Sequence, residues 1–218
     1  MNKLAPEIMS RTSEIVCRRT VKALENHAFT AVYYASTADA TDYLIKSAAQ
    51  AKTVGFGGSL SIVDLNINDK LAATGAELLL HGNPTLSDDA KTSIAKRQLT
   101  CDLFLCGVNA VTTSGEIVNI DGVGNRVASA IYGPAKIIMV AGRNKIVEGD
   151  VADAIRRIKA YAAPANALRL NKNTPCAKTG ACADCNSPDR ICRVTVILER
   201  QPSRSNITVL VVNEDMGF

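Results

Sequence analysis

The sequence contains no tryptophan, and aromatic residues make up only 4% of its 218 residues. Its 25 lysines and arginines, against 21 aspartates and glutamates, give a net charge of +4. The basic residues are spread along the chain and form no basic cluster. Proteins that bind nucleic acids usually combine a basic surface with aromatic side chains on which bases stack. We therefore expect no nucleic-acid partner.

Long hydrophobic runs are also missing. A membrane helix needs about 18 or more consecutive apolar residues, and a signal peptide needs an apolar core of about 7–15 residues. Neither occurs here, so we expect no membrane partner and a cytoplasmic location. Histidine is scarce: His27 and His81 show no metal-ligand spacing, and no G-x-S-x-G nucleophile elbow accompanies them, which disfavours hydrolases.

What the sequence does contain is an alternation of short apolar runs with helical patterns. Such alternation predicts an α/β fold with an open, mainly parallel sheet and helices on both faces. Amphipathic spacing predicts N-terminal helices over residues 1–27. Two strand-like runs, 193–200 and 206–213, are joined by a turn-rich segment and predict a C-terminal hairpin. One core over residues 1–218 suits this length. The expected strands of the sheet are 28–35, 52–56, 76–81, 102–108 and 136–141.

Four of the seven cysteines fall in a loop at 174–192, namely Cys176, Cys182, Cys185 and Cys192. The loop has little apolar content, so it needs another source of order. Four thiolates can close a zinc site or hold an iron–sulfur cluster. Because only one Cys-x2-Cys pair is present, we favour a 4Fe-4S cluster and keep zinc as the alternative. Free thiols are the remaining interpretation.

A glycine-rich turn, Gly55-Phe56-Gly57-Gly58-Ser59, separates an expected strand from an expected helix. Glycine lets a ligand approach the backbone closely, and a helix N-terminus favours an anion. The turn lacks the last glycine of the dinucleotide motif and the lysine of a Walker loop. We predict that Gly55, Gly57, Gly58 and Ser59 contact a phosphate or carboxylate; an ordinary tight turn is the alternative.

The polar stretch 109–126 follows a buried strand, where open α/β sheets usually bind ligands. Asn109, Thr112, Thr113 and Asn125 could donate or accept hydrogen bonds, and Arg126 could pair with an anion. Glu116 or Asp121 could serve as a base if burial raised its pKa. The alternative is that 116–121 forms part of a hairpin with no chemical role.

The glycine turn GFGGS, the stretch LFLCGVNAVTTSGEIVNIDGVGNRVAS, the segment GPAKIIMVAGRNKIV and the terminal VVNEDMGF together resemble the LUD family of lactate-utilisation proteins. The resemblance covers about residues 5–218. It implies a fold similar to the sugar-phosphate isomerase and coenzyme A transferase superfamily (NagB/RpiA/CoA transferase-like). It also implies a link to lactate oxidation alongside iron–sulfur redox partner proteins, and it supplies no catalytic residues.

Three functions follow as hypotheses. The first is a protein of lactate-like 2-hydroxy-acid metabolism that binds a small anionic ligand in the Gly/Asn/Thr-rich cleft and a metal centre in the cysteine loop. The second is an isomerase or acyl/CoA-transferase-type enzyme whose zinc or cluster is structural. The third is a non-catalytic sensor or scaffold that binds a partner protein. The sequence leaves open whether the chain is an enzyme and whether it forms a homo-oligomer.

Overall fold

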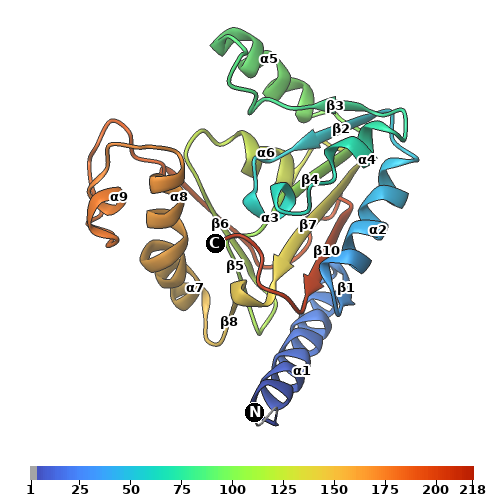
Figure 1. The fold of residues 1–218 in the computed structure, drawn as a ribbon, viewed down its shortest axis with the longest axis vertical. Helices are drawn as coiled ribbons and strands as arrows, with labels where there is room; N and C mark the ends of the chain where they lie inside the picture. Colours follow the sequence, from blue (N-terminus) through green and yellow to red (C-terminus); the bar gives the residue numbers. More distant parts are fainter. Residues whose placement is uncertain (1–3) are drawn as a thin grey trace.

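The computed structural model describes residues 4–218, and these form a large parallel sheet with a smaller sheet beside it (Figure 1). The large sheet has six strands in the order β1-β10-β7-β4-β2-β3, and each neighbouring pair is parallel. Its strands are β1 (Thr30–Tyr34), β2 (Thr53–Phe56), β3 (Glu77–Leu79), β4 (Leu103–Gly107), β7 (Lys136–Gly142) and β10 (Ile207–Val212). This confirms the expected α/β class.

The central strands are buried on both faces, as the apolar runs predict. Side chains alternate between two cores because successive residues of a strand point to opposite faces. In β7, Ile137 and Met139 join the first core, whereas Ile138 and Val140 join the second. All six residues of β10 are buried.

Helices cover each core. On the first face lie α1 (Leu4–Asn26), α5 (Asp88–Gln98) and α6 (Asn125–Ile131); on the second lie α2 (Thr37–Ala48), α3 (Leu60–Val63) and α4 (Asn68–Ala72). Serine side chains cap two of them: Ser36 accepts from the Asp39 N–H, and Ser87 accepts from the Ala90 N–H. Figure 1 shows α1 extending well beyond the sheet.

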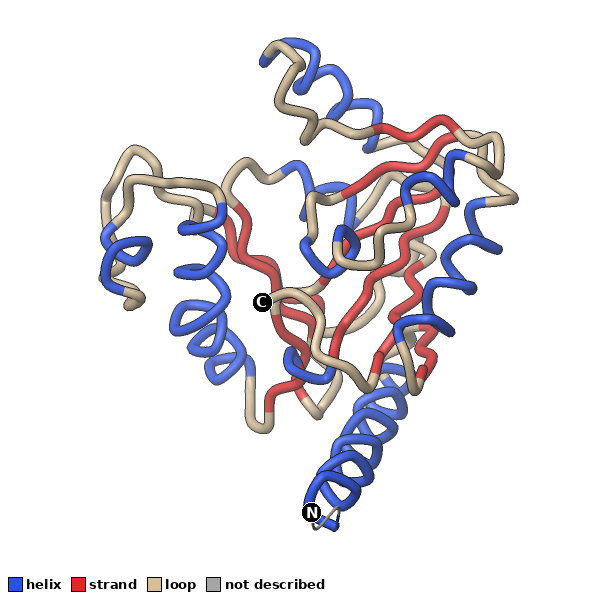
Figure 2. Tube along the Cα trace, in the orientation of Figure 1, coloured by secondary structure: helices blue, strands red, loops and turns tan. Residues whose placement is uncertain are grey.

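The smaller sheet lies beside the large one and has the order β8-β5-β6-β9 among the described residues (Figure 2). It consists of β5 (Ala110–Thr112), β6 (Ile117–Asp121), β8 (Ile146–Val147) and β9 (Val194–Leu198). A nearly continuous helical rod packs against it through a third apolar core: α7 (Val151–Arg157), a π-helical turn (Ile158–Ala162) and α8 (Ala163–Arg169). The short α9 (Pro175–Thr179) follows, and a 3-10 turn (Arg143–Lys145) links β7 to β8.

The structure corrects the predicted C-terminal hairpin. β9 pairs antiparallel with β6 in the small sheet, whereas β10 enters the large sheet between β1 and β7. The two runs therefore belong to different sheets, and β10 is too apolar for any position other than a buried centre. The N-terminal region, expected as one or two helices, is one helix over Leu4–Asn26. No helix in the described part is long and apolar enough to cross a membrane.

Candidate functional site

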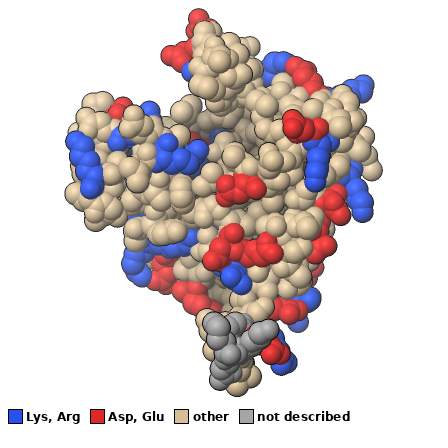
Figure 3. Space-filling view, viewed as in Figure 1, with Lys and Arg blue, Asp and Glu red and all other residues tan. Residues whose placement is uncertain are grey.

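A cavity of about 440 Å³ opens where β2, β3 and β4 end and the small sheet and α8 begin. This is the carboxyl edge of the parallel strands, where α/β sheets usually bind ligands. Figure 3 shows a hollow in the surface here, with Lys and Arg side chains gathered beside it over α8 and α9. Its polar lining includes Gly57, Gly58, His81, Asn109, Asp121, Asn125, Arg126, Asn166, Arg169 and Lys172.

Arg126 and Asp121 form a largely buried ion pair in the wall of this cavity. The Arg126 Nε donates to Asp121 Oδ2 at 3.2 Å, and their side chains are 14% and 9% exposed. The Arg126 Nη2 donates to Asn109 Oδ1 at 3.1 Å and to the Ile120 carbonyl at 2.6 Å. Among the described residues the Nη1 nitrogen has no hydrogen-bond partner, so its two hydrogens remain available to an anion.

Asp121 does not have the properties of a general base. Burial alone would raise its pKa, but the Arg126 charge and the N–H groups of Gly124 and Val123 outweigh burial, and the pKa is lowered. Glu116 likewise has a lowered pKa, because hydrogen bonds from Thr112 and Ser114 outweigh burial. The condition under which either carboxylate could act as a base, a raised pKa, is therefore not met.

The glycine turn forms the floor of the cavity. A Cβ added at Gly57 would lie 2.8 Å from Arg126 Cγ and 2.8 Å from Cys106 Cβ, so no side chain fits there. Gly58 has a φ of +66°, in the left-handed region that favours glycine. These two positions let the backbone come close to the Arg126 side chain and to any ligand beside it.

Of the ligand-binding residues predicted from sequence, the cavity brings together Gly57, Gly58, Asn109, Asn125 and Arg126, together with Asp121. Ser59 lines a neighbouring apolar cavity instead. Gly55 lies within β2, where an added Cβ would be 3.0 Å from Cys101 Sγ. Thr112, Thr113 and Glu116 are absent from the lining, because they form the turn at the far end of the β5–β6 hairpin.

A buried lysine lies behind the cavity. Lys145 is only 4% exposed, and its Nζ donates to the hydroxyl of Ser61 at 2.6 Å. Burial lowers the pKa of Lys145 to about 7, and the positive charges of Arg157 and Arg126 add to the effect. Arg157 itself donates to the carbonyl oxygens of Asn109 and Asn144. Three basic side chains therefore converge behind the carboxyl edge of β4 and β7.

Lys145 predicts a pH dependence of stability. Its ordinary pKa is 10.5, so between pH 7 and 10.5 the unfolded chain binds more protons at this residue than the folded chain, and the free energy of unfolding rises with pH. The slope should approach about 1.4 kcal/mol per pH unit. Lys145→Met should flatten it. Urea unfolding from pH 7 to 8 measures this, below the ordinary thiol pKa of 9.0 around which Cys17, Cys101 and Cys106, whose pKa values are raised by burial, contribute the opposite slope. Equal slopes in both proteins would refute the assignment.

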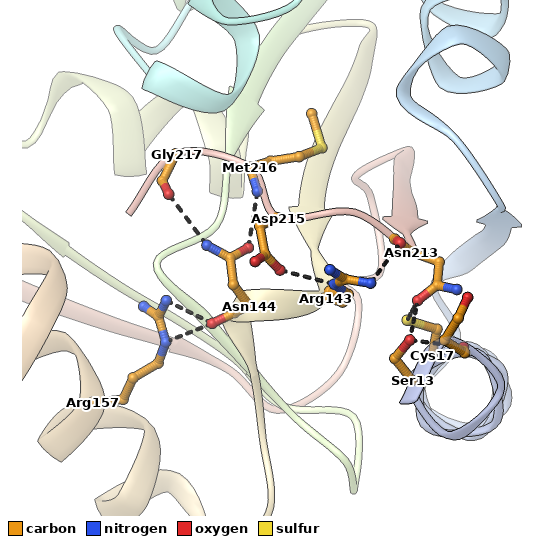
Figure 4. Close-up of polar contacts among 10 residues, drawn as sticks. Ser13, Cys17, Arg143, Asn144, Arg157, Asn213, Asp215, Met216 and Gly217 are labelled. Atoms are coloured by element: carbon orange, nitrogen blue, oxygen red, sulfur yellow. Dashed lines mark hydrogen bonds and ion pairs between the residues drawn. The ribbon is translucent and has the colours of Figure 1, made fainter. Parts of the chain in front are cut away.

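The C-terminal segment 213–218 covers this edge of the sheet (Figure 4). Asn144 holds it by two hydrogen bonds, accepting from the Met216 N–H and donating to the Gly217 carbonyl. Arg143 pairs with Asp215 at 2.9 Å. The Ser61 hydroxyl, in turn, lies 3.3 Å from the Met216 carbonyl, so this segment encloses Lys145 and Ser61 from solvent.

The four cysteines of 174–192 line a second, small cavity. Arg190 ties the segment together, since its guanidinium donates to the carbonyl oxygens of Cys185 and Cys192 and pairs with Asp184. Cys176 Sγ lies 3.3 Å from the Thr174 hydroxyl. No three His, Cys, Asp or Glu side chains within residues 4–218 are arranged closely enough to hold a metal ion. The thiols therefore share a cavity without forming a completed ligand set.

The cysteine segment borders the ligand cavity. Ala163, Ile191 and Cys192 line both cavities, so one layer of side chains separates the two. In sequence, the segment 174–192 begins about 50 residues after the stretch 109–126 that supplies much of the ligand cavity. The chain returns to it because Arg193 donates its backbone N–H to the Asp121 carbonyl, where β9 begins to pair with β6.

Several residues of this site were not predicted from sequence. His81 has no metal-ligand spacing in the sequence, and Lys145 lies in a short polar run, Arg143-Asn144-Lys145, that is typical of solvated charges. Arg157 at the end of α7, Asn166 and Arg169 in α8, and Lys172 after α8 carry no motif that would mark them as ligand-binding residues. The one available signal is position: His81 ends the expected strand 76–81 and Lys145 follows the expected strand 136–141, at the edge of a parallel sheet where ligands bind.

The comparisons with known proteins concern the family and the fold of the chain. The LUD domain model matches residues 17–212, nearly the whole chain. The chain belongs to the LUD domain family. No curated protein matches it. The family also contains proteins of lactate utilisation. The solved structures that resemble this LUD protein provide evidence about its fold alone.

Among solved structures, the LUD chain is similar to a DUF162 family protein from Deinococcus radiodurans, with a TM-score of 0.52 and 14% sequence identity over 92% of this chain and 98% of that one. It also matches eIF2B beta from Chaetomium thermophilum, with a TM-score of 0.32 and 18% identity over 63% of this chain and 44% of that one. The first likeness supports the α/β fold; the second is too distant to carry an argument.

Proposed function

We propose that this LUD protein serves lactate-like 2-hydroxy-acid metabolism by binding a small carboxylate in the 440 Å³ cavity, with Arg126 as the residue that holds the carboxylate. The observation that carries the proposal is the guanidinium of Arg126, a residue that lines the cavity: its Nη1 nitrogen has no hydrogen-bond partner among residues 4–218, while the other two nitrogens are fixed. A fixed guanidinium is well suited to a carboxylate. The volume is within the range of about 300–1,000 Å³ typical of small-molecule sites.

The charge balance favours a monocarboxylate over a phosphate dianion. The lowered pKa of Asp121 keeps its carboxylate ionised beside Arg126, so the pair is close to neutral. Because this pair is close to neutral, it gives a dianion no extra attraction, and the remaining charge of a dianion would have to be offset by side chains such as Arg169, which is exposed and therefore screened by solvent. Arg169 and Lys172, which also line the cavity, supply the additional positive charge that attracts an anion.

Isothermal titration calorimetry with L-lactate, pyruvate and inorganic phosphate tests this function. We expect saturable binding of at least one of the two carboxylates and weaker binding of phosphate at pH 8, where phosphate is a dianion. Absence of saturable binding by both carboxylates would refute the proposal, and so would tighter binding of phosphate than of either carboxylate.

We also propose that Cys176, Cys182, Cys185 and Cys192 hold a metal centre, with an iron–sulfur cluster of the 4Fe-4S type favoured over zinc. Support comes from the donor set, because four soft thiols line one cavity within a segment of little apolar content. Binding would require the four thiols to come closer together, since no three of them among the described residues are arranged to hold a metal ion. A cluster there would exchange electrons with a redox partner protein.

A further inference from the structure

His81 is a residue of the ligand cavity that the sequence did not identify. It follows β3 and lines both the main cavity and the apolar cavity next to it. A Cβ added at Gly58 would lie 3.9 Å from His81 Nε2, so this nitrogen faces the glycine turn. The other ring nitrogen, Nδ1, lies 3.0 Å from the amide nitrogen of Gln98.

Gln98 determines which nitrogen of the His81 imidazole ring carries the proton. Its side chain is fully buried, and its Nε2 lies 2.6 Å from the Leu79 carbonyl and 3.1 Å from the Phe56 carbonyl. Carbonyl oxygens only accept hydrogen bonds, so the NH2 group must face them; a flipped amide would place an oxygen against both. The amide oxygen, by contrast, is buried without a partner among the described residues.

The consequence for His81 is a defined tautomer. The two hydrogens of the Gln98 amide already face the Leu79 and Phe56 carbonyls. An amide NH2 cannot accept a hydrogen bond, so a proton on Nδ1 of His81 would find no acceptor there, and Nδ1 carries none. The ring proton therefore sits on Nε2, the nitrogen that faces the glycine turn. Protonating the ring would set an N–H of Nδ1 against the amide hydrogens of Gln98. Burial also lowers the pKa of His81, partly offset by the negative charge of Asp121.

We propose that His81 is the neutral hydrogen-bond donor of the ligand cavity, with its Nε2–H directed at the oxygen on C2 of a carboxylate held by Arg126. This inference rests on the proposed function and adds the residue that would recognise a 2-hydroxy or 2-oxo group. A neutral imidazole polarises a C2 oxygen without transferring a proton to it, and Arg126 takes the carboxylate. Two hydrogen-bond donors, Arg126 and His81, would then bind the carboxylate and the C2 oxygen of the same small acid.

Propionate provides the discriminating probe, because it keeps the carboxylate of lactate and pyruvate but has no oxygen on C2. We expect calorimetry to give tighter binding of L-lactate or pyruvate than of propionate, by about tenfold for one hydrogen bond in a buried site. His81→Phe should abolish that preference and leave propionate binding unchanged. His27→Asn, which alters the other histidine outside both cavities, is the control and should retain the preference.

The outcomes separate this inference from the proposed function. If no carboxylate binds, the proposed function fails. If propionate binds as tightly as lactate and pyruvate, or if His81→Phe weakens all three acids equally, only the role of His81 fails. A measurement on the unsubstituted protein keeps the test independent of folding of the variant: ¹⁵N NMR at pH 7 should show a neutral His81 ring with the proton on Nε2. A charged ring, or a proton on Nδ1, would overturn the inference.

Discussion

Anaerobically purified protein carrying Cys192→Ser is expected to hold far less iron and sulfide than the unsubstituted chain. Cys192 is half-buried at the boundary of the two cavities, and a serine hydroxyl is a poor ligand for a soft metal centre. Loss of one of four thiolates from a loop with little apolar content should remove most of the bound metal. Iron, sulfide and zinc analysis, together with the visible absorption of the protein, measures the effect.

The matched control is Cys17→Ser. Cys17 is fully buried in α1, where its sulfur lies 3.8 Å from Asn213 Oδ1, far along the chain from the segment 174–192 (Figure 4). This variant should keep the metal content of the unsubstituted chain. Retention of full metal content by Cys192→Ser would contradict the metal site. A colourless chain with one zinc, lost in Cys192→Ser but kept in Cys17→Ser, would retain the site and replace the iron–sulfur cluster by zinc.

Arg126→Gln should weaken binding of L-lactate or pyruvate by about 10–100-fold, because a charge-assisted hydrogen bond contributes about 1.5–3 kcal/mol. The substitution also leaves Asp121, only 9% exposed, without its partner, which should lower the free energy of unfolding by about 3 kcal/mol. Calorimetry measures the first effect and urea unfolding the second. Binding must be measured under conditions in which unfolding curves show that the variant is folded.

Arg97→Gln supplies the control for this experiment. Arg97 also forms an ion pair, with Glu77 at 2.6 Å, but both side chains are about half exposed and neither lines the ligand cavity. Its removal should change stability by less than about 1 kcal/mol and leave carboxylate affinity unchanged. Folded Arg126→Gln protein that binds both acids with unaltered affinity would remove Arg126 from the site.

The parts of the fold that the sequence predicts are those set by local patterns. The apolar run of β4 and the glycine turn after β2 are visible from composition alone, and both lie where expected. β10 is different. Its apolar residues predict a buried strand, but its position between β1 and β7 depends on pairing with segments about 70 and 180 residues earlier, and no local pattern records such pairing.

In the candidate site, too, local sequence patterns do not determine which residues come together. The stretch 109–126 is continuous in sequence, yet Asn109 and Asp121 line the cavity whereas Glu116 does not. β5 and β6 run antiparallel, so the turn between them lies about 15 Å from Asp121 at about 3.3 Å per residue. The environment of a carboxylate is equally hidden: the pKa of Asp121 falls because of N–H groups and a guanidinium whose approach only the folded chain defines.

The central place of β10 has a consequence for how this chain reaches its native state. β1 and β7 each pair with β10 along the whole strand, and the large sheet is split in two until β10 is in place. During synthesis, the other strands of the large sheet leave the ribosome before β10. The edges of β1 and β7 that pair with β10 remain unpaired until residues 207–212 have emerged. We expect nascent chains that stop before residue 207 to be held by chaperones or degraded, and the chain to become protease-resistant only once the last strand has emerged.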